Sequence, residues 1–119
     1  MPANDHEKTT EDESSVIDIE PLQLKERLKT NHLQLIDVRE PHEWDICHIE
    51  GATLIPLGQI QNRLSEISGD DEVIIYCKMG GRSKKAYKIL QDNGFGTLKN
   101  LRGGIRAWSE EVDPDIPTY

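Results

Sequence analysis

The fold of this chain is indicated most clearly by residues 73–83, which read VIIYCKMGGRS. The first four residues are apolar or aromatic and mostly β-branched, which is typical of a strand buried on both faces of a parallel sheet. Cys77 follows the strand, two adjacent glycines lie three residues further on, and a helical pattern begins at about Ser83. A strand, a short loop and a helix in direct succession are typical of parallel α/β folds. The sequence therefore predicts such a fold, with Cys77 at the carboxyl end of a strong central strand.

Strand-like and helix-like segments alternate along the rest of the chain. Further strands are expected at Leu35–Val38, Thr53–Ile55 and Leu98–Leu101, with an edge strand at Val16–Ile17. Helices are expected from Pro21, from Pro41 to Trp44, along the stripe of Ile60, Leu64 and Ile67, from Ser83 to a stop at Asn93-Gly94, and after Gly103-Gly104. Together they predict one α/β domain over residues 16–119, with a central, mostly parallel sheet of about five strands flanked by helices.

Composition limits the classes of protein to which the chain can belong. Its 119 residues suffice for one packed core but not for two. The 14 basic and 22 acidic residues give a formal charge of -8, which argues against nonspecific binding to nucleic acid, because such binding needs a basic surface. No apolar run approaches the length of a membrane span, so no membrane association is expected.

Much of the acidity lies at the N-terminus. Residues 1–15 carry five acidic side chains against one lysine and lack the apolar stretch of a secretory signal. We expect a disordered tail or linker there, because the segment has too little apolar surface to offset the entropy of ordering. With only Cys47 and Cys77, a disulfide framework is not expected, and the interpretation is reduced thiols in the cytoplasm.

A basic segment begins at Cys77 in this otherwise acidic chain. The stretch from Cys77 to Lys88 contains no acidic residue and five cations: Lys78, Arg82, Lys84, Lys85 and Lys88. Such an island on an acidic domain indicates that an anion is bound there. A solvated helix face rich in lysine is the alternative, and charge alone favours that alternative.

The position of Cys77 favours its thiolate form. A cysteine at the amino end of a helix lies where unpaired N–H groups and the positive end of the helix dipole stabilise an anion. Gly80 and Gly81 permit backbone conformations in which successive N–H groups surround one charged atom. Nearby cations add positive potential. A buried structural cysteine is the alternative, but the position, the glycines and the cations together favour a functional thiol.

The same loop resembles a known active site. Residues 77–82 form a C-x4-R pattern similar to the active-site loop of rhodanese-like sulfurtransferases, and Ser83 opens the next helix. The resemblance extends to three other segments: DVRE at residues 37–40, EWDICHIEGA at 43–52 and LRGGIRAW at 101–108. Four segments in the family's order are far more specific than one loop. Cys47 departs from the pattern, because the family usually has glycine before this histidine.

The C-terminal segment narrows the resemblance to one subgroup. Residues 108–119, WSEEVDPDIPTY, and residues 54–58, LIPLG, resemble the C-terminal rhodanese domain of ThiF/MoeB-type adenylyltransferase/sulfurtransferase proteins. This implies an adenylating enzyme and a ubiquitin-like sulfur carrier as partners, in molybdopterin or thiamine synthesis or in tRNA thiolation. The chain has no nucleotide-binding glycine loop ahead of a helix and no CxxC pair. We therefore expect a stand-alone relative or a portion of a longer protein.

The resemblance implies a role for each residue of the loop. Cys77 is the expected catalytic residue, which takes sulfur as a persulfide from thiosulfate or another small anionic donor, or from a cysteine desulfurase persulfide. The expected anion-binding residues are Lys78, Met79, Gly80, Gly81, Arg82 and Ser83. Asp37 and Arg39 are expected to support the loop and line its mouth, and for Arg39 a salt bridge with Glu40 or Glu43 is an equal alternative. No cofactor is expected, because sulfur supplies its own nucleophile and leaving group.

Two other functions are compatible with this topology. A cysteine-dependent phosphatase or arsenate reductase shares it, but those loops resemble C-x5-R, because a tetrahedral oxyanion needs a wider ring of N–H donors than one sulfur atom. Four residues lie between Cys77 and Arg82, which favours sulfur. The second alternative is a noncatalytic docking module, although many such relatives lack the cysteine that this chain keeps.

Three other side chains are functional candidates: His42, Cys47 and His48. The histidines lack the cluster of further ligands that a metal site needs, so no metal site is expected. Cys47 could resolve a persulfide by forming an internal disulfide, but its helix and its apolar neighbour Ile46 favour an inert thiol.

Overall fold

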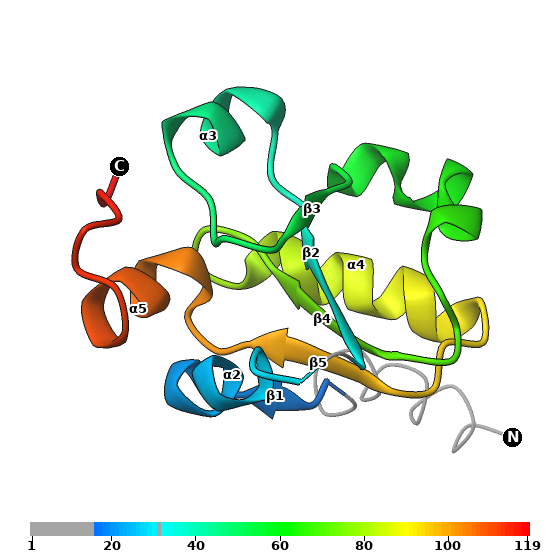
Figure 1. Cartoon of the computed structure of the whole chain (residues 1–119). Coiled ribbons are helices and arrows are strands. Elements are labelled where there is room, and N and C mark those ends of the chain that lie inside the picture. The colour runs from blue at the N-terminus through cyan, green and yellow to red at the C-terminus, as the bar shows by residue number, and fades with distance from the viewer. Residues whose placement is uncertain (1–15, 31) are drawn as a thin grey trace, which may run out of the picture.

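The computed structural model describes residues 16–30 and 32–119, so the tail expected at residues 1–15 lies outside the described residues. It contains a five-stranded sheet in which all neighbouring strands are parallel, in the order β1-β5-β4-β2-β3. The strands are β1 (Asp18–Ile19), β2 (Leu33–Asp37), β3 (Thr53–Leu54), β4 (Glu72–Tyr76) and β5 (Leu98–Leu101). The expected α/β architecture is confirmed (Figure 1).

The central strand β4 contributes side chains to both layers of the core. Val73, Ile74 and Ile75 are each at most 1% exposed. Because side chains alternate between the two faces of a strand, Val73 and Ile75 pack into one apolar cluster, while Ile74 and Tyr76 pack into the other. Each such side chain stabilises the fold by about 1.5–3 kcal/mol. This explains why the strand that precedes Cys77 is the most apolar segment of the chain.

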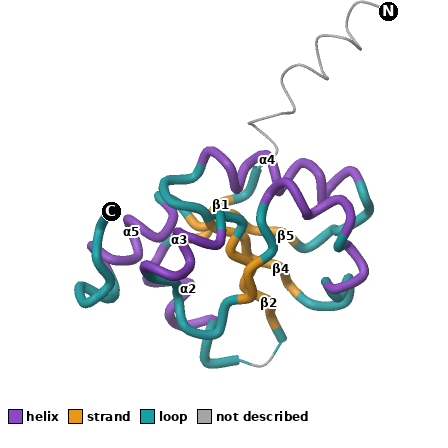
Figure 2. The backbone as a smooth tube through the Cα atoms, turned by 90° about the horizontal axis from the view of Figure 1, so that it is seen from above, coloured by secondary structure: helices purple, strands orange, loops and turns teal. Residues whose placement is uncertain are grey.

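Helices cover both faces of the sheet. They are α2 (Pro21–Arg27), α3 (Pro41–Ile46), α4 (Gly81–Asp92) and α5 (Gly104–Glu111), with two 3₁₀ helices, η1 (Leu57–Asn62) and η2 (Leu64–Glu66). α4 and η1 pack on the face that carries Ile75, whereas α2 and α5 pack on the face that carries Ile74 (Figures 1 and 2). Among the helices of the described residues, none combines the length and the apolar character that a membrane crossing requires.

The segment of residues 57–67 differs from the expected α-helix. Ile60 and Ile67 are buried as the stripe predicts, but the backbone forms η1 and η2 instead. Arg63 separates them, and its φ of -122° lies outside the helical range. Spacings of three and four residues bury the same side chains in a broken 3₁₀ segment, so the apolar stripe could not distinguish the two conformations.

Several element boundaries also differ from expectation: β2 covers Leu33–Asp37 rather than Leu35–Val38, β3 ends at Leu54 rather than Ile55, and α3 continues to Ile46 rather than ending at Trp44. The edge strand is Asp18–Ile19 rather than Val16–Ile17, because Ile19 packs into the core whereas Ile17 is 54% exposed. Helix α4 begins at Gly81, two residues before Ser83. Gly80 makes this possible: its φ of +124° turns the chain sharply after the strand, so that the helix starts at the next residue.

The amino end of α5 holds the loop that follows β4. The Ile105 N–H donates to the carbonyl of Cys77 at 2.8 Å, and the Arg106 N–H donates to that of Lys78 at 3.1 Å. Gly104 lies against these carbonyls with a φ of +62°. A Cβ atom at this position would clash with the carbonyl oxygens of both Cys77 and Lys78. The GG pair of the LRGGIRAW segment therefore permits a close backbone approach.

Replacing Gly104 by alanine should destabilise the domain. Gly104→Ala combines an unfavourable positive φ with a steric clash against two backbone carbonyls, so we expect a loss of about 3 kcal/mol. Urea unfolding measures this loss. Gly96→Ala is the matched control, because a Cβ there meets no atom within 4 Å and φ is outside the left-handed range. Equal stability of the two variants would contradict this account of the Gly104 contact.

Candidate active site

Cys77 lies at the end of β4, directly before the turn into α4. Its side chain is 1% exposed. The Gly80 N–H donates to Sγ at 3.0 Å, and the Ser83 hydroxyl oxygen lies 3.4 Å from Sγ. The turn therefore wraps around the sulfur, and the amino end of a 12-residue helix follows at once. Both the N–H donor and the helix dipole favour negative charge on this sulfur.

The hydrogen bonds from α5 also shape the loop. They engage the carbonyls of Cys77 and Lys78, so these acceptors are directed toward α5. At the amino end of α4, the carbonyl of Gly80 accepts the first intrahelical hydrogen bond, from the Lys84 N–H. The N–H groups of Gly81, Arg82 and Ser83 precede it, in the first turn, where N–H groups have no intrahelical acceptor. The carbonyls of Cys77 and Lys78 are therefore engaged by α5, whereas N–H groups at the amino end of α4 are left without intrahelical acceptors.

Lys78 and Met79 form the outer part of the loop. Met79 is 62% exposed. The Nζ atom of Lys78 lies 4.5 Å from the centre of the Tyr119 ring, a cation–π geometry. Neither side chain has a recorded hydrogen bond to the sulfur. Their expected role in binding an anion stays a prediction.

The Arg82 side chain binds Glu43 of α3 in a bidentate ion pair. Its two terminal nitrogens lie 2.6 and 2.8 Å from the two carboxylate oxygens. The hydrogen bonds from Arg82 hold the pKa of Glu43 well below its usual range, although burial alone would raise it. Sequence reasoning placed the charge of Arg82 toward the sulfur and missed Glu43 as its partner. The role expected for Arg82 in binding the anion therefore stays a prediction.

Asp37 and Arg39 form a second, fully buried ion pair. The Arg39 Nη2 donates to Asp37 Oδ2 at 2.7 Å, and both side chains are 0% exposed. The backbone N–H of Arg39 also donates to Asp37 Oδ1. Arg39 Nη2 reaches the carbonyl of Cys47 at 2.6 Å, at the end of α3. The pair thus links β2 to α3, and the recorded partner of Arg39 is the Asp37 carboxylate rather than that of Glu40 or Glu43.

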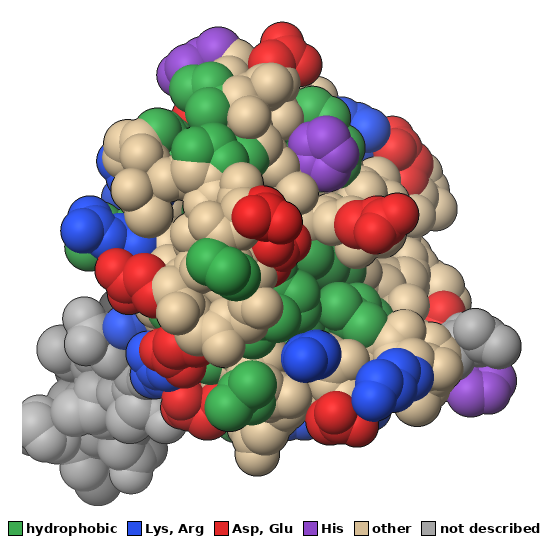
Figure 3. All heavy atoms as spheres, turned by 60° about the vertical axis from the view of Figure 1, so that its left-hand side comes forward, with side chains coloured by type: hydrophobic (Ala, Val, Ile, Leu, Met, Phe, Trp, Pro, Cys, Tyr) green, Lys and Arg blue, Asp and Glu red, His purple; other side chains and the backbone are tan. Residues whose placement is uncertain are grey.

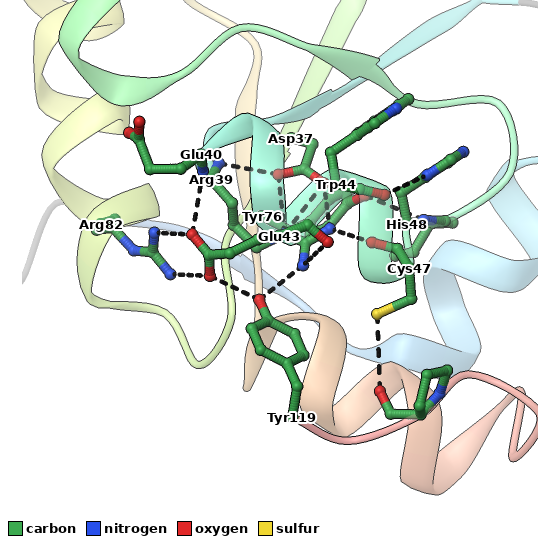
Figure 4. A network of polar contacts seen from close by, with 12 residues as sticks. Asp37, Arg39, Glu40, Glu43, Trp44, Cys47, His48, Tyr76, Arg82 and Tyr119 are labelled. Carbon is green, nitrogen blue, oxygen red and sulfur yellow. Dashed lines mark hydrogen bonds and ion pairs between the residues drawn. The ribbon is translucent and has the colours of Figure 1, made fainter.

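Tyr119 connects the two ion pairs. Its hydroxyl accepts from Arg39 Nη1 at 2.6 Å and donates to Glu43 Oε2 at 2.7 Å. Figure 4 shows the phenol of Tyr119 reaching between Arg39 and Glu43, from a segment far from either in the sequence. Burial raises the pKa of Tyr119 to about 12, so the hydroxyl keeps its proton and can donate it to Glu43. No local pattern in the sequence indicates this contact, because it spans 76 residues.

The C-terminal segment covers the side of the loop. A small hollow beside it is lined by Lys78, Ile105, Arg106, Pro117, Thr118 and Tyr119. Viewed from the side of α5 and the C-terminus, apolar side chains gather between acidic and basic ones (Figure 3).

Cys47 is partly exposed, and its Sγ lies 3.6 Å from the carbonyl of Pro117. Within the described residues, no group of three or more His, Cys, Asp or Glu side chains forms a metal-binding cluster.

Comparison with known proteins identifies the family. Residues 20–111 match the Rhodanese-like domain family. The chain belongs to this family. The "Probable adenylyltransferase/sulfurtransferase MoeZ" of Mycobacterium tuberculosis is 41% identical over 104 residues, covering 85% of this chain and 26% of that protein. A "Sulfurtransferase" of Allochromatium vinosum is 41% identical over 102 residues, covering 85% of this chain and 95% of that one.

A solved structure supports the same assignment. The rhodanese-like domain protein from Staphylococcus aureus superposes with a TM-score of 0.75 at 32% identity, over 82% of this chain and 95% of that one. The expected resemblance to rhodanese domains of adenylyltransferase/sulfurtransferase proteins is confirmed by the MoeZ match. This rhodanese-like domain spans only about a quarter of the length of MoeZ.

The Glu43–Arg82 pair should make the stability of the rhodanese-like domain depend on pH. Because folding lowers the pKa of Glu43, its contribution is complete above about pH 4.3, the ordinary value for glutamate, and is lost as the pH falls toward the folded value. Glu43→Gln should therefore cost about 2 kcal/mol near neutral pH. The difference from the wild type should shrink in acid.

Urea unfolding at neutral pH and at about pH 3 measures this difference. Glu50→Gln is the matched control, because Glu50 is an exposed acidic residue that forms no ion pair with another described residue. It should leave the free energy of unfolding unchanged at both values. A Glu43→Gln deficit that stays constant across this range would show that the ion pair is not its cause.

Proposed function

We propose that this rhodanese-like domain is a sulfurtransferase that carries sulfur as a persulfide on Cys77. The observation that supports this most strongly is the six-residue loop from Cys77 to Arg82, whose Gly80 N–H donates to the sulfur at 3.0 Å. A relative of similar length, at 41% identity, is named a sulfurtransferase. Family membership supports sulfur transfer in general, and the role of Cys77 is part of the proposal.

The proposed reaction is a double displacement. The Cys77 thiolate attacks the outer sulfur of the donor, and a new S–S bond forms on Sγ. The former bond to that sulfur breaks, and its electron pair leaves with sulfite when the donor is thiosulfate, or with the donor cysteine when it is a protein persulfide. An acceptor thiol or cyanide then attacks the outer sulfur, the Sγ–S bond breaks, and Cys77 leaves as a thiolate.

The persulfide anion needs donors close to Sγ, and the loop supplies them. We assign to the N–H groups of Gly81, Arg82 and Ser83, which lie in the first turn of α4, the role of supplementing the Gly80 N–H around the outer sulfur. Because the Arg82 guanidinium is paired with Glu43, we assign most of the stabilisation to these backbone dipoles. Electrons move only between sulfur atoms and their leaving groups in this scheme, so the chemistry requires no further group.

The donor and the acceptor are inferred from the chemistry and the relatives. The cations of the loop and the first turns of α4 suit a small anionic donor such as thiosulfate, or a desulfurase persulfide presented by a protein. The match to MoeZ, named an adenylyltransferase/sulfurtransferase, supports an acyl-adenylate on a ubiquitin-like carrier as the acceptor. In that case the persulfide attacks the acyl carbon and displaces AMP, which leaves the carrier bound to Cys77 as an acyl disulfide. A second thiol then attacks Cys77 Sγ, the bond between Sγ and the outer sulfur breaks, and the carrier leaves as a thiocarboxylate while Cys77 forms a disulfide with that thiol. An adenylating enzyme is a partner in this scheme.

Thiosulfate should persulfidate Cys77. Incubation with thiosulfate should add the mass of one sulfur atom to the protein. Peptide mass spectrometry should locate this sulfur on Cys77, and treatment with cyanide or dithiothreitol should remove it. Cys77→Ser should abolish the adduct. Cys47→Ser is the matched control and should retain it, since Cys47 lies outside the loop. An adduct confined to Cys47 would overturn the assignment, and absence of any transfer would favour a noncatalytic docking module.

Loop length should select sulfur over phosphate. Four residues between Cys77 and Arg82 form a ring sized for one sulfur atom, which cannot offer donors to all three nonbridging oxygens of a phosphoryl group. The wild type should transfer sulfur from thiosulfate to cyanide and hydrolyse an aryl phosphate negligibly.

Inserting one glycine between Gly80 and Gly81 should cost the domain most of its sulfur transfer, because the wider ring no longer fits the sulfur. Circular dichroism checks that the variant is folded. Faster hydrolysis of the phosphate ester than sulfur transfer by the wild-type domain would replace this proposal with the phosphatase alternative.

A further inference from the structure

A line of polar side chains runs from the edge of the sheet to the cysteine. The Asn100 Nδ2 donates to Asp18 Oδ1 at 2.9 Å, between strands β5 and β1. The Ser83 hydroxyl lies 2.5 Å from Asn100 Oδ1 and 3.4 Å from Cys77 Sγ. Ser83, Asn100 and Cys77 are each at most 1% exposed. Buried polar groups must satisfy one another, so the partners available to each atom are strictly limited.

The direction of each hydrogen bond in this line follows from the chemistry. A carboxylate only accepts, so the amide NH₂ of Asn100 must face Asp18, and the amide oxygen must face Ser83. That oxygen can only accept, so Ser83 donates its single hydroxyl proton to Asn100. The lone pairs of Ser83 then face Cys77, where they accept from the thiol.

A second acceptor is available to the Ser83 proton. The carbonyl of Gly80 lies 3.0 Å from the hydroxyl oxygen. That carbonyl already accepts the Lys84 N–H at 3.2 Å, and it is farther from Ser83 than the Asn100 oxygen. Both the distances and the existing bond favour Asn100 as the acceptor.

We propose that Asn100 and Asp18 are positioning residues that turn the Ser83 proton away from Cys77 and so oppose formation of its thiolate. This deepens the proposed function, on which it rests for the role of Cys77. With the proton directed to Asn100, Ser83 stabilises the thiol. To stabilise the thiolate, the hydroxyl must rotate and leave the Asn100 oxygen without its donor. The thiol and thiolate forms of Cys77 therefore correspond to two orientations of the Ser83 hydroxyl proton, toward Asn100 and toward Sγ.

The test is the pH profile of alkylation by iodoacetamide, in a Cys47→Ser background so that Cys77 alone reacts. Asn100→Leu removes the acceptor at similar volume, and frees the Ser83 proton for an anionic sulfur, a stronger acceptor than the Gly80 carbonyl. We expect the midpoint to fall by about one pH unit. Asp18→Asn, which allows the Asn100 amide to flip, should shift it less, in the same direction.

The Ser83→Ala background separates this mechanism from a general disturbance of the core. If Asn100 acts through the Ser83 proton, Asn100→Leu should leave the profile of Ser83→Ala unchanged, as in any double-mutant cycle with a shared partner. Leu98→Val, a buried change on the same strand, is the matched control and should not shift the wild-type profile. Circular dichroism establishes that each variant is folded.

The surrounding charges are the same in all the Asn100 variants. The charged and titratable groups on the neighbouring elements are Asp18 on β1, the Asp37–Arg39 pair, the Arg82–Glu43 pair, Lys78 in the loop, Lys84 and Lys85 on α4, Arg106 on α5, and Tyr119. A shift caused by Asn100→Leu therefore cannot arise from a change of charge.

Three results would overturn the inference: an equal shift in the Ser83→Ala background, a shift to higher pH, or no shift in folded Asn100→Leu. If Asn100→Leu does not fold, Asp18→Asn is compared with and without Ser83→Ala, because the effect of its lost charge persists without Ser83 whereas the effect on the Ser83 proton does not. An unchanged profile, or an equal shift in both backgrounds, then overturns it. Persulfide formation from thiosulfate is measured separately on the same proteins. Absence of persulfide with the expected alkylation shifts would reject the proposed function and leave the positioning role intact.

Discussion

The structure around Cys77 depends on the close contact between the amino end of α5 and the loop that follows β4. The two hydrogen bonds to the carbonyls of Cys77 and Lys78 engage the acceptors of the loop, and the N–H of Gly80 is then available to the sulfur. Only glycine at position 104 allows the two backbones to approach this closely. A segment 27 residues after the cysteine thus determines which groups the cysteine contacts.

Two ion pairs fix α3 beside this loop. Glu43 binds Arg82 from α4, while Arg39 binds both Asp37 and the carbonyl that ends α3. The Tyr119 hydroxyl joins the two pairs by accepting from one and donating to the other. Burying these charges is unfavourable unless each has its partners, and among the described residues no buried side-chain nitrogen or oxygen lacks a hydrogen-bond partner.

Those parts of the fold that depend on local pattern could be predicted from the sequence. The apolar run before Cys77 and the glycines after it led to a parallel sheet with the cysteine at a strand end, because strand periodicity and turn chemistry are both local. The α-helix predicted for residues 57–67 was wrong, because an α-helix and a pair of 3₁₀ helices bury the same apolar stripe. The partners of Arg82 and Ser83 were missed for another reason. Glu43 and Asn100 lie far from them in sequence, and nothing in a single sequence pairs distant polar residues.

The position of β1 affects how this domain is assembled during synthesis. Among the described residues β1 is the first strand and β5 the last, and β1 pairs with β5 alone, through contacts that span 82 residues. Because distant segments close slowly and only once both exist, β1 stays without its neighbour until β5 has left the ribosome. The polar line from Asp18 to Cys77 is therefore completed only after β5 has been synthesised. Until then Cys77 lacks the part of its buried surroundings that Asn100 on β5 provides in the folded domain.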